Sequence, residues 1–202
     1  MRYIAITGVA LFSLLLGTIV GYYTNIEVPE IVIHWPDRKA NEYSPSYNGE
    51  TGDEVAFIFI GSSKCQYAND ERVNRIVRRA KLHLSRLINE KGLGFSATGI
   101  AKDWIVRDGI EYLGKFGSFD EILAGRSWLN EGVLKYVYEE IPGYAATPQI
   151  IVTKRKVLGV DHDYYGTIGE RILTRKIGIQ ELLNWEKNGF PIPVVSSQSM
   201  VR

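Results

Sequence analysis

The sequence predicts an α/β fold with a mainly parallel sheet, and three observations support this prediction. Val55–Ile60 is an uninterrupted apolar run, which is typical of a strand buried on both faces in a parallel-type sheet. From about Asn69 to Glu90, apolar residues recur at helical spacing and form one stripe of a long amphipathic helix. A second apolar run, Phe95–Ala101, then predicts a second strand parallel to the first.

The N-terminal stretch Tyr3–Ile26 contains no charged residue. A spanning helix needs about 20 apolar residues, so this run is long enough to cross a membrane. A cleaved signal peptide is the alternative, but its apolar region usually has only about 7–15 residues and ends at a site flanked by small residues. The end of this run offers no convincing site of that kind. We therefore expect residues 1–26 to be an uncleaved anchor, with the domain outside the cytoplasm, in the periplasm of a Gram-negative cell.

The chain after the anchor divides into a linker, one domain and a tail. Residues 27–52 are rich in proline, serine and asparagine and predict a tether. We place the domain at 53–189 and a flexible tail at 190–202. The long helix at Asn69–Glu90 ends at Gly92 and Gly94. Its solvent side is predicted to carry six cations, which are Arg72, Arg75, Arg78, Arg79, Lys81 and Arg86.

In the middle of the domain, some segments predict secondary structure weakly and others strongly. Ile105–Phe116 predicts a short, weak helix with two internal glycines, and Phe119–Leu123 predicts a short strand or a loop. Ser127–Ile141 has good helical spacing, with Ser127 as the expected cap and Pro142 as the stop.

The C-terminal third predicts an antiparallel hairpin and a helix. Gln149–Thr153 has the composition of a strand, and Lys154–Lys156 is interpreted as a tight turn into a second strand, Val157–Val160. After a predicted loop at residues 161–169, Arg171–Lys176 extends this sheet. Ile179–Trp185 then predicts a last short helix, which ends at Asn188 and Gly189.

Cys65, the only cysteine, lies between the first strand and the long helix. A single cysteine excludes an intrachain disulfide and a zinc site built from cysteines. We expect Cys65 to sit at the helix N-terminus, where partial positive charge favours a thiolate. The neighbouring cations Lys64, Arg72 and Arg75 would act in the same direction.

Two motifs in this order of elements resemble the thioredoxin-like superfamily. Residues 65–68, Cys-Gln-Tyr-Ala, stand where that superfamily has C-x-x-C, so Ala68 replaces the second cysteine. Residues 146–149, Ala-Thr-Pro-Gln, precede a strand and resemble the loop that carries a cis-proline. The resemblance covers roughly Val55–Gly189. It implies a thioredoxin-like three-layer sandwich with a strand-helix insertion at Phe119–Ile141, preceded here by one transmembrane helix.

The resemblance also implies roles for individual residues. Cys65 takes the place of the nucleophile, and Thr147 and Pro148 take the place of the substrate clamp. The predicted substrate- or partner-binding residues are Lys64, Gln66, Tyr67, Thr147, Pro148, Asp103 and Trp104. Asp103 and Trp104 are included because they follow the second parallel strand, and ligands of α/β sheets gather at such ends. The alternative for this pair is a helix cap and a packing aromatic.

Three functions remain open for a domain with this motif. Cys65 could act as a monothiol in exchange or redox sensing, with its intermediate resolved by a protein thiol or a small thiol. The domain could instead be a redox-inactive interaction or assembly module of the cell envelope, or Cys65 could be an inert core residue. The net charge of +1 supports no nucleic-acid partner, and three scattered histidines predict no metal site. No nucleotide-binding or hydrolase motif is present, so no cofactor is expected.

Overall fold

The fold is built around one five-stranded sheet, with β1 (Gly52–Gly61) in the middle. The computed structural model describes residues 42–45, 51–161 and 164–193. Val55–Ile60 in β1 are all fully buried. Because side chains on both faces of β1 are covered, the uninterrupted apolar run replaces the alternation expected of a half-exposed strand.

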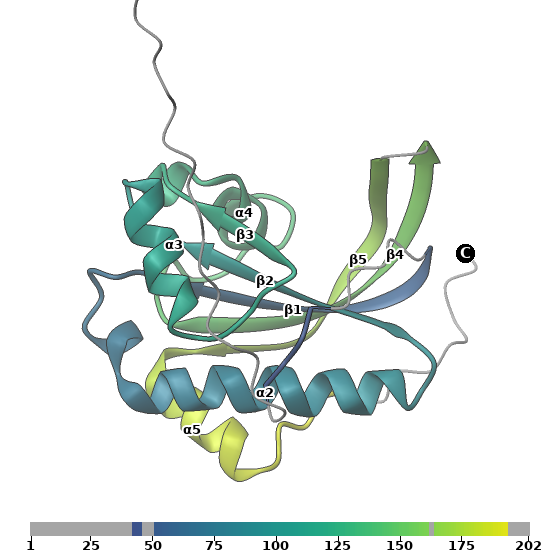
Figure 1. Ribbon diagram of the computed structural model, residues 1–202, viewed down its shortest axis with the longest axis horizontal. Coiled ribbons are helices and arrows are strands. Elements are labelled where there is room, and N and C mark those ends of the chain that lie inside the picture. The colour runs from purple at the N-terminus through teal and green to yellow at the C-terminus, as the bar shows by residue number, and fades with distance from the viewer. Residues whose placement is uncertain (1–41, 46–50, 162–163, 194–202) are drawn as a thin grey trace, which may run out of the picture. The chain divides into compact units, whose positions relative to one another are not determined.

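The sheet has the order β3-β2-β1-β4-β5 (Figure 1). β2 (Gly94–Ala101) pairs parallel with β1, and β3 (Glu121–Ala124) pairs parallel with β2. β4 (Gln149–Asp161) runs antiparallel to β1, and β5 (Tyr164–Ile177) runs antiparallel to β4. The predicted parallel pair and the C-terminal antiparallel strands are therefore confirmed, and Phe119–Leu123 does contain a strand.

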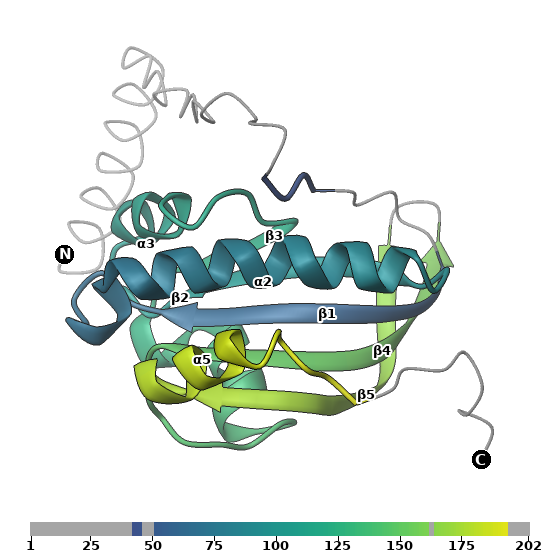
Figure 2. The same cartoon turned by 90° about the horizontal axis from the view of Figure 1, so that it is seen from below.

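Three regular helices cover one face of the sheet, as Figure 2 shows; we call it the helix face. They are α2 (Glu71–Asn89), α3 (Val106–Gly114) and α5 (Gly178–Lys187), close to the predicted helices. Phe57 and Phe59 of β1 point into this core with the predicted apolar stripe of α2. Phe59 lies against Phe116, with ring centroids 4.6 Å apart.

The opposite face, which we call the insertion face, is covered by the chain between β3 and β4. The single helix predicted over Ser127–Ile141 is wrong. The segment forms the 3₁₀ turn η2 (Ser127–Leu129), the short α4 (Glu131–Val133) and the π-helical turn η3 (Leu134–Tyr138). Ser127 does not cap a helix, because it has a positive φ of 53° and Asn130 accepts the capping bond from the Gly132 N–H at 3.0 Å.

A contact from β5 explains how this irregular segment is held. The Arg175 guanidinium donates hydrogen bonds to the carbonyls of Tyr136 at 2.9 Å and Ile141 at 2.8 Å. The carbonyls of this segment therefore find a donor outside the segment, whereas in a continuous helix backbone N–H groups would donate to them. Beneath it, Ile58, Ile60 and Ile151 form a second, smaller apolar cluster with Val133 and Val137.

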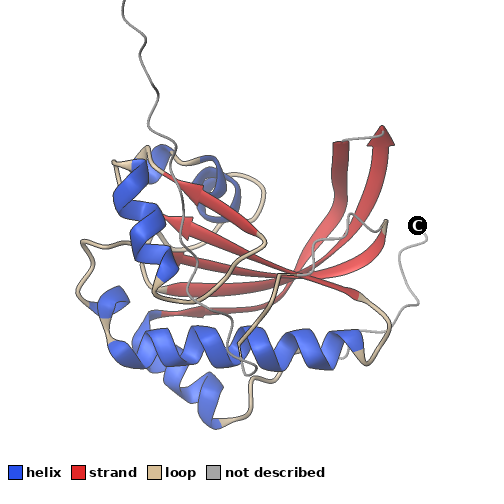
Figure 3. Ribbon diagram, viewed as in Figure 1, coloured by secondary structure: helices blue, strands red, loops and turns tan. Residues whose placement is uncertain are grey.

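The turn predicted at Lys154–Lys156 is also wrong, because these residues lie inside β4. The buried Lys154 forms an ion pair with Asp53 at 2.8 Å, and Arg155 pairs with Glu54 at 2.7 Å. Each cation is thus neutralised by an acid on β1, so a charged run continues the strand. β5 takes up most of the predicted loop at 161–169. Figure 3 shows this hairpin bending away from the other strands.

Lys81 corrects the predicted solvent face of α2. It is 1 % exposed, and its ammonium group donates to the Ser118 carbonyl at 2.6 Å. The same group lies 3.8 Å from the centre of the Phe119 ring. Lys81 follows Val77 by four residues, so it belongs by spacing to the apolar stripe rather than to the opposite side.

Both ends of the chain are only partly described. The predicted anchor Tyr3–Ile26 and most of the linker lie outside the described residues. Within the described ranges, no helix has the length and apolarity needed to span a membrane. The described linker residue Tyr43 is buried and donates its hydroxyl proton to Asp120. In the predicted tail, Phe190 is buried and the Trp185 indole donates to the Pro191 carbonyl at 3.0 Å, while residues 194–202 lie outside the description.

Candidate functional site

Cys65 lies half-buried in the loop that follows β1. Its backbone N–H donates to the Ser62 carbonyl at 3.1 Å. The expectation that Cys65 caps the long helix is wrong in its detail. A 3₁₀ turn, η1 (Tyr67–Asn69), comes first, and Asp70 is the N-cap of α2, accepting from the Arg72 N–H at 2.9 Å. The end of α2 is therefore satisfied by a carboxylate rather than by the thiol.

The predicted cations around Cys65 are mostly engaged with carboxylates. Arg72 forms an ion pair with Asp70 at 2.7 Å, and Arg75 forms one with Glu186 at 3.2 Å. The hydrogen bond from the Arg72 side chain lowers the pKa of Asp70 to about 2, so this acid stays ionised and offsets the neighbouring charge. Lys64 is exposed next to Cys65. Of the three cations expected to support a thiolate, two are therefore paired elsewhere.

The loop before β4 meets Cys65 from the other side. The Thr147–Pro148 peptide bond is cis, and Pro148 is buried. The Cys65 thiol donates to the Thr147 carbonyl oxygen, with sulfur and oxygen 3.4 Å apart. The two sequence motifs are thus in direct contact, because the end of β1 and the start of β4 are neighbours in the sheet.

The fold is thioredoxin-like. The strand order β2-β1-β4-β5 and the helices that follow β1 and β5 establish this directly. No family model and no curated protein matches the chain. A solved thioredoxin domain of a thiol-disulfide oxidoreductase from Bacteroides vulgatus is similar at 14% identity, with a TM-score of 0.39. The match covers 68% of this chain and 80% of that domain.

Ala68, at the place of the second cysteine, is completely buried. Its carbonyl accepts a hydrogen bond from the Tyr112 hydroxyl at 3.0 Å. A Cβ at Gly61 would collide with the same hydroxyl, so Tyr112 packs directly beneath the loop. Burial raises the pKa of Tyr112, which keeps it protonated as a donor. This position has no group that could resolve a mixed disulfide of this thioredoxin-like domain.

Asp103 borders the Cys65 loop, as predicted. Its buried carboxylate accepts from the Ser63 N–H at 3.1 Å and from the Ser63 hydroxyl at 2.5 Å. The alternative interpretation as a helix cap is wrong, because α3 begins at Val106 with Ile105 at the cap. Trp104 is not a packing aromatic either, because most of its side chain is exposed. Gln66 and Tyr67 are exposed on the loop itself.

Sequence reasoning missed three residues that shape the loop: Ser63, Asn69 and Tyr112. The Asn69 amide donates to the carbonyls of Ser62, Ser63 and Cys65 at 3.2, 2.9 and 2.8 Å. An asparagine just after a turn rich in small residues could have indicated this clamp. The role of Tyr112 depends on where α3 packs, and no local signal indicated it.

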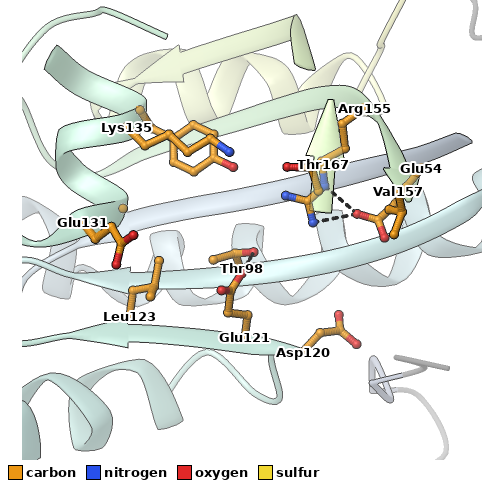
Figure 4. Close-up of a pocket in the computed structure, with 12 residues that line it drawn as sticks. Glu54, Thr98, Asp120, Glu121, Leu123, Glu131, Lys135, Arg155, Val157 and Thr167 are labelled. Atoms are coloured by element: carbon orange, nitrogen blue, oxygen red, sulfur yellow. Dashed lines mark hydrogen bonds and ion pairs between the residues drawn. The ribbon is translucent and has the colours of Figure 1, made fainter. Parts of the chain in front are cut away.

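A polar cavity of about 570 Å³ lies on the insertion face, toward the start of β1 (Figure 4). On its floor Glu54 accepts from Arg155 at 2.7 Å and from Ser96 at 2.7 Å. On its wall Lys135 pairs with Glu170 at 2.8 Å. None of the residues lining this cavity belongs to the Cys65 loop or the cis-proline loop, so it is a separate feature.

Proposed function

We propose that this protein is a membrane-tethered thioredoxin-like protein that exchanges thiols through Cys65 alone. The observation that carries the proposal is the 3.4 Å contact between the Cys65 sulfur and the Thr147 carbonyl. A half-buried thiol at this junction can be reached from solvent, while its loop is fixed by Asn69 and Asp103. Attack on a disulfide requires an accessible sulfur that loses its proton to become the thiolate.

The reaction consists of two thiol–disulfide exchanges, and neither step needs an additional oxidant. The Cys65 thiolate attacks one sulfur of a partner disulfide, forming a Cys65–partner bond and releasing the other partner sulfur as a thiolate. Because Ala68 carries no sulfur, the mixed disulfide persists until an external thiol attacks it. That second attack regenerates the Cys65 thiolate and leaves the external thiol joined to the partner. The resolving thiol would come from a protein or from a small thiol.

Oxidised glutathione is a direct probe for this reaction with the full-length chain. We expect one glutathione to add at Cys65, to persist after removal of excess reagent, and to leave on addition of reduced glutathione. Intact-mass measurement counts the adduct, and the Cys65→Ser variant is the control. Labelling only after unfolding would contradict the proposal.

An Ala68→Cys variant makes the same test sharper. It restores the C-x-x-C spacing. We therefore expect the new thiolate at position 68 to attack the Cys65–glutathione disulfide, which releases reduced glutathione and forms a disulfide within the chain. Persistence of the adduct in Ala68→Cys would mean that residue 68, buried beneath the loop, cannot reach the Cys65 sulfur.

A redox-inactive interaction module is the second candidate. It is favoured by the burial of Ala68 against Tyr112, which makes that position part of the core. Under this hypothesis Cys65→Ser would retain full function in a complementation assay, whereas a bulky change at Thr147 would abolish it. Loss of function in Cys65→Ser with normal folding would reject the module.

Membrane tethering belongs to the same proposal and rests on the charge-free stretch Tyr3–Ile26. We expect the full-length chain to stay with membranes after alkaline carbonate washing. A variant with two charged residues at positions 13 and 14, in the middle of the stretch, should be released. Release of the unmodified chain would remove this part of the proposal without affecting the chemistry of Cys65.

A further inference from the structure

Two linker residues, Glu42 and Tyr43, are packed against the helix face; we call them the strap. Tyr43 is 5% exposed, and its ring meets the Phe95 ring edge-on, with centroids 5.5 Å apart. The Glu42 carboxylate pairs with Arg78 of α2 at 2.6 Å. A Cβ at Gly117 would collide with that carboxylate, so glycine leaves the room that the strap needs. The strap therefore fits its site closely, although the sequence places it in a tether.

A carboxylate just before β3 also holds the strap. The Tyr43 hydroxyl donates to Asp120, whose carboxylate accepts from the Ala97 N–H of β2 at 2.6 Å as well. The Asp120 N–H donates to the Ala97 carbonyl at 2.8 Å. The strap is thus joined to the sheet through Asp120 and, through Glu42, to α2.

Lys81 of α2 lies beneath the strap. Both line a cavity of about 170 Å³, and the Lys81 ammonium lies 5.6 Å from the centre of the Tyr43 ring. That ammonium donates to the Ser118 carbonyl, and within the described ranges no carboxylate forms an ion pair with it. Glu42 pairs with Arg78 instead. A buried ammonium without a paired carboxylate is costly, because burial removes its hydration.

Charged and titratable groups from three parts of the chain surround Lys81. They are Glu42 and Tyr43 of the strap, Arg78 and Arg79 of α2, and Asp120 before β3. Arg79 is paired with Glu186 at 2.7 Å. Burial lowers the pKa of Lys81 to about 7, and Arg78 adds to this effect, whereas Glu42 and Asp120 act in the opposite direction. The burial that the strap helps to provide is therefore unfavourable for a charged Lys81.

Protonation of Lys81 and closure of the strap oppose each other. Once the strap leaves, water reaches the ammonium, and the pKa of Lys81 moves toward the ordinary lysine value of about 10.4. The open form therefore binds the proton more strongly than the closed form. Between about pH 10 and pH 7, each fall in pH shifts the equilibrium toward the open form, and below about pH 7 the shift levels off.

We propose that the strap is released by acid, because a proton taken up by Lys81 favours the form in which Glu42 and Tyr43 have left α2. Release removes the attachment of the linker at this helix. Resting on the proposed membrane tethering, it loosens the domain on its expected anchor. The strap contains no part of the Cys65 loop, so its release does not require Cys65 to react.

The bond between Glu42 and Tyr43 gives a direct test, because a glutamyl endopeptidase cuts it only after the strap is released. The full-length chain in detergent is digested at low protease concentration from pH 6 to pH 9, and the cut after Glu42 is followed by mass. Its rate is divided by the rate for a free peptide of residues 38–47, which removes the pH dependence of the protease. We expect this ratio to rise about 10- to 50-fold from pH 9 to pH 7, and by about twofold or less from pH 7 to pH 6.

Two variants assign the pH dependence to Lys81 and to the strap. Lys81→Met removes the titrating group, so the bond should stay protected at pH 9 and the rise at pH 7 should disappear. Lys91→Met, at an exposed position just after α2, is the matched control and should behave as the unmodified chain. Because coupling is reciprocal, Tyr43→Ala should move the titration midpoint of the Lys81 ammonium, measured by NMR, toward the ordinary lysine value.

Three outcomes would overturn the proposal. Equal ratios at pH 9 and pH 7 in the unmodified chain would do so, as would an unchanged rise in Lys81→Met. Cuts after the buried Glu54 that accompany the cut after Glu42 would show global unfolding instead of release of the strap. The glutathione reaction is scored separately. A failed strap therefore leaves the proposed thiol exchange intact, and a failed exchange leaves the strap intact.

Discussion

The two faces of the sheet are covered by different kinds of structure. The helix face is covered by three regular helices over a large apolar core that includes Phe57, Phe59 and Trp185. The insertion face carries a smaller apolar cluster and a set of charged residues joined in pairs around a cavity. Regular helices thus cover the large apolar core, whereas the irregular segment on the insertion face is held by polar contacts from a distant strand.

The largest expected effect tests the dry core of the helix face. Phe59→Ala should lower the free energy of unfolding by about 3–5 kcal/mol, because it leaves a cavity between α3 and the sheet. Ile141→Ala, at the margin of the cluster on the insertion face, should cost about 2 kcal/mol. Urea denaturation followed by circular dichroism measures both. Equal losses would show that the two cores are equally well packed.

The paired charges of the insertion face give the next effect. Glu54→Ala leaves the buried Arg155 guanidinium without its carboxylate and should cost about 3 kcal/mol. The double variant Glu54→Leu, Arg155→Met removes both charges and should recover most of that loss. Denaturation of the two variants side by side checks this. A double variant as unstable as the single one would mean that the pair is needed for more than mutual neutralisation.

Lys81 is the exception on the helix face, a single buried cation among aromatic rings. Burial lowers the pKa of Lys81 to about 7, with a further contribution from Arg78. Between about pH 7 and the ordinary lysine value, the unfolded chain binds this proton and the folded chain does not. Burial of this lysine therefore lowers the free energy of unfolding at low pH, and that free energy rises with pH across this window, by about 2–3 kcal/mol between pH 6 and 9.

Lys81→Met should remove this part of the pH dependence and stabilise the protein most at pH 6. Denaturation midpoints at pH 6 and 9 provide the measurement, with the exposed Lys91→Met as the matched control. An unchanged slope in Lys81→Met would contradict the assignment of the pH dependence to this residue.

The smallest expected effect concerns the Cys65 loop, which the Asp103 carboxylate holds through Ser63. Asp103→Asn should cost about 1.5 kcal/mol, because an amide replaces the carboxylate that accepts both Ser63 bonds. The loosened loop should also let Cys65 react faster with iodoacetamide. Asp108→Asn, on the first turn of α3, is the control. A slower reaction in Asp103→Asn would mean that the held loop favours attack.

Local pattern predicted the helix face well. The apolar stripe of α2 and the buried run of β1 are short-range signals, and each was found near its predicted bounds. The resemblance also identified the two motifs, whose residues Cys65 and Thr147 are in contact in the structure. Ser127–Ile141 and Lys154–Lys156 were misjudged for a shared reason. Their conformations depend on Arg175, Asp53 and Glu54, which come from other strands.

The sequence by itself therefore determined the buried strand β1, the long helix α2, the lone cysteine and the missing resolving thiol. These features follow from residue type and from periodicity along one segment. Only the tertiary structure decided that Lys81 is buried, that Asp103 holds Ser63 and that Trp104 is exposed beside Cys65. Each of these depends on which distant groups meet. A charged or aromatic side chain is stable in either environment when partners are present, so its position is set by the fold as a whole.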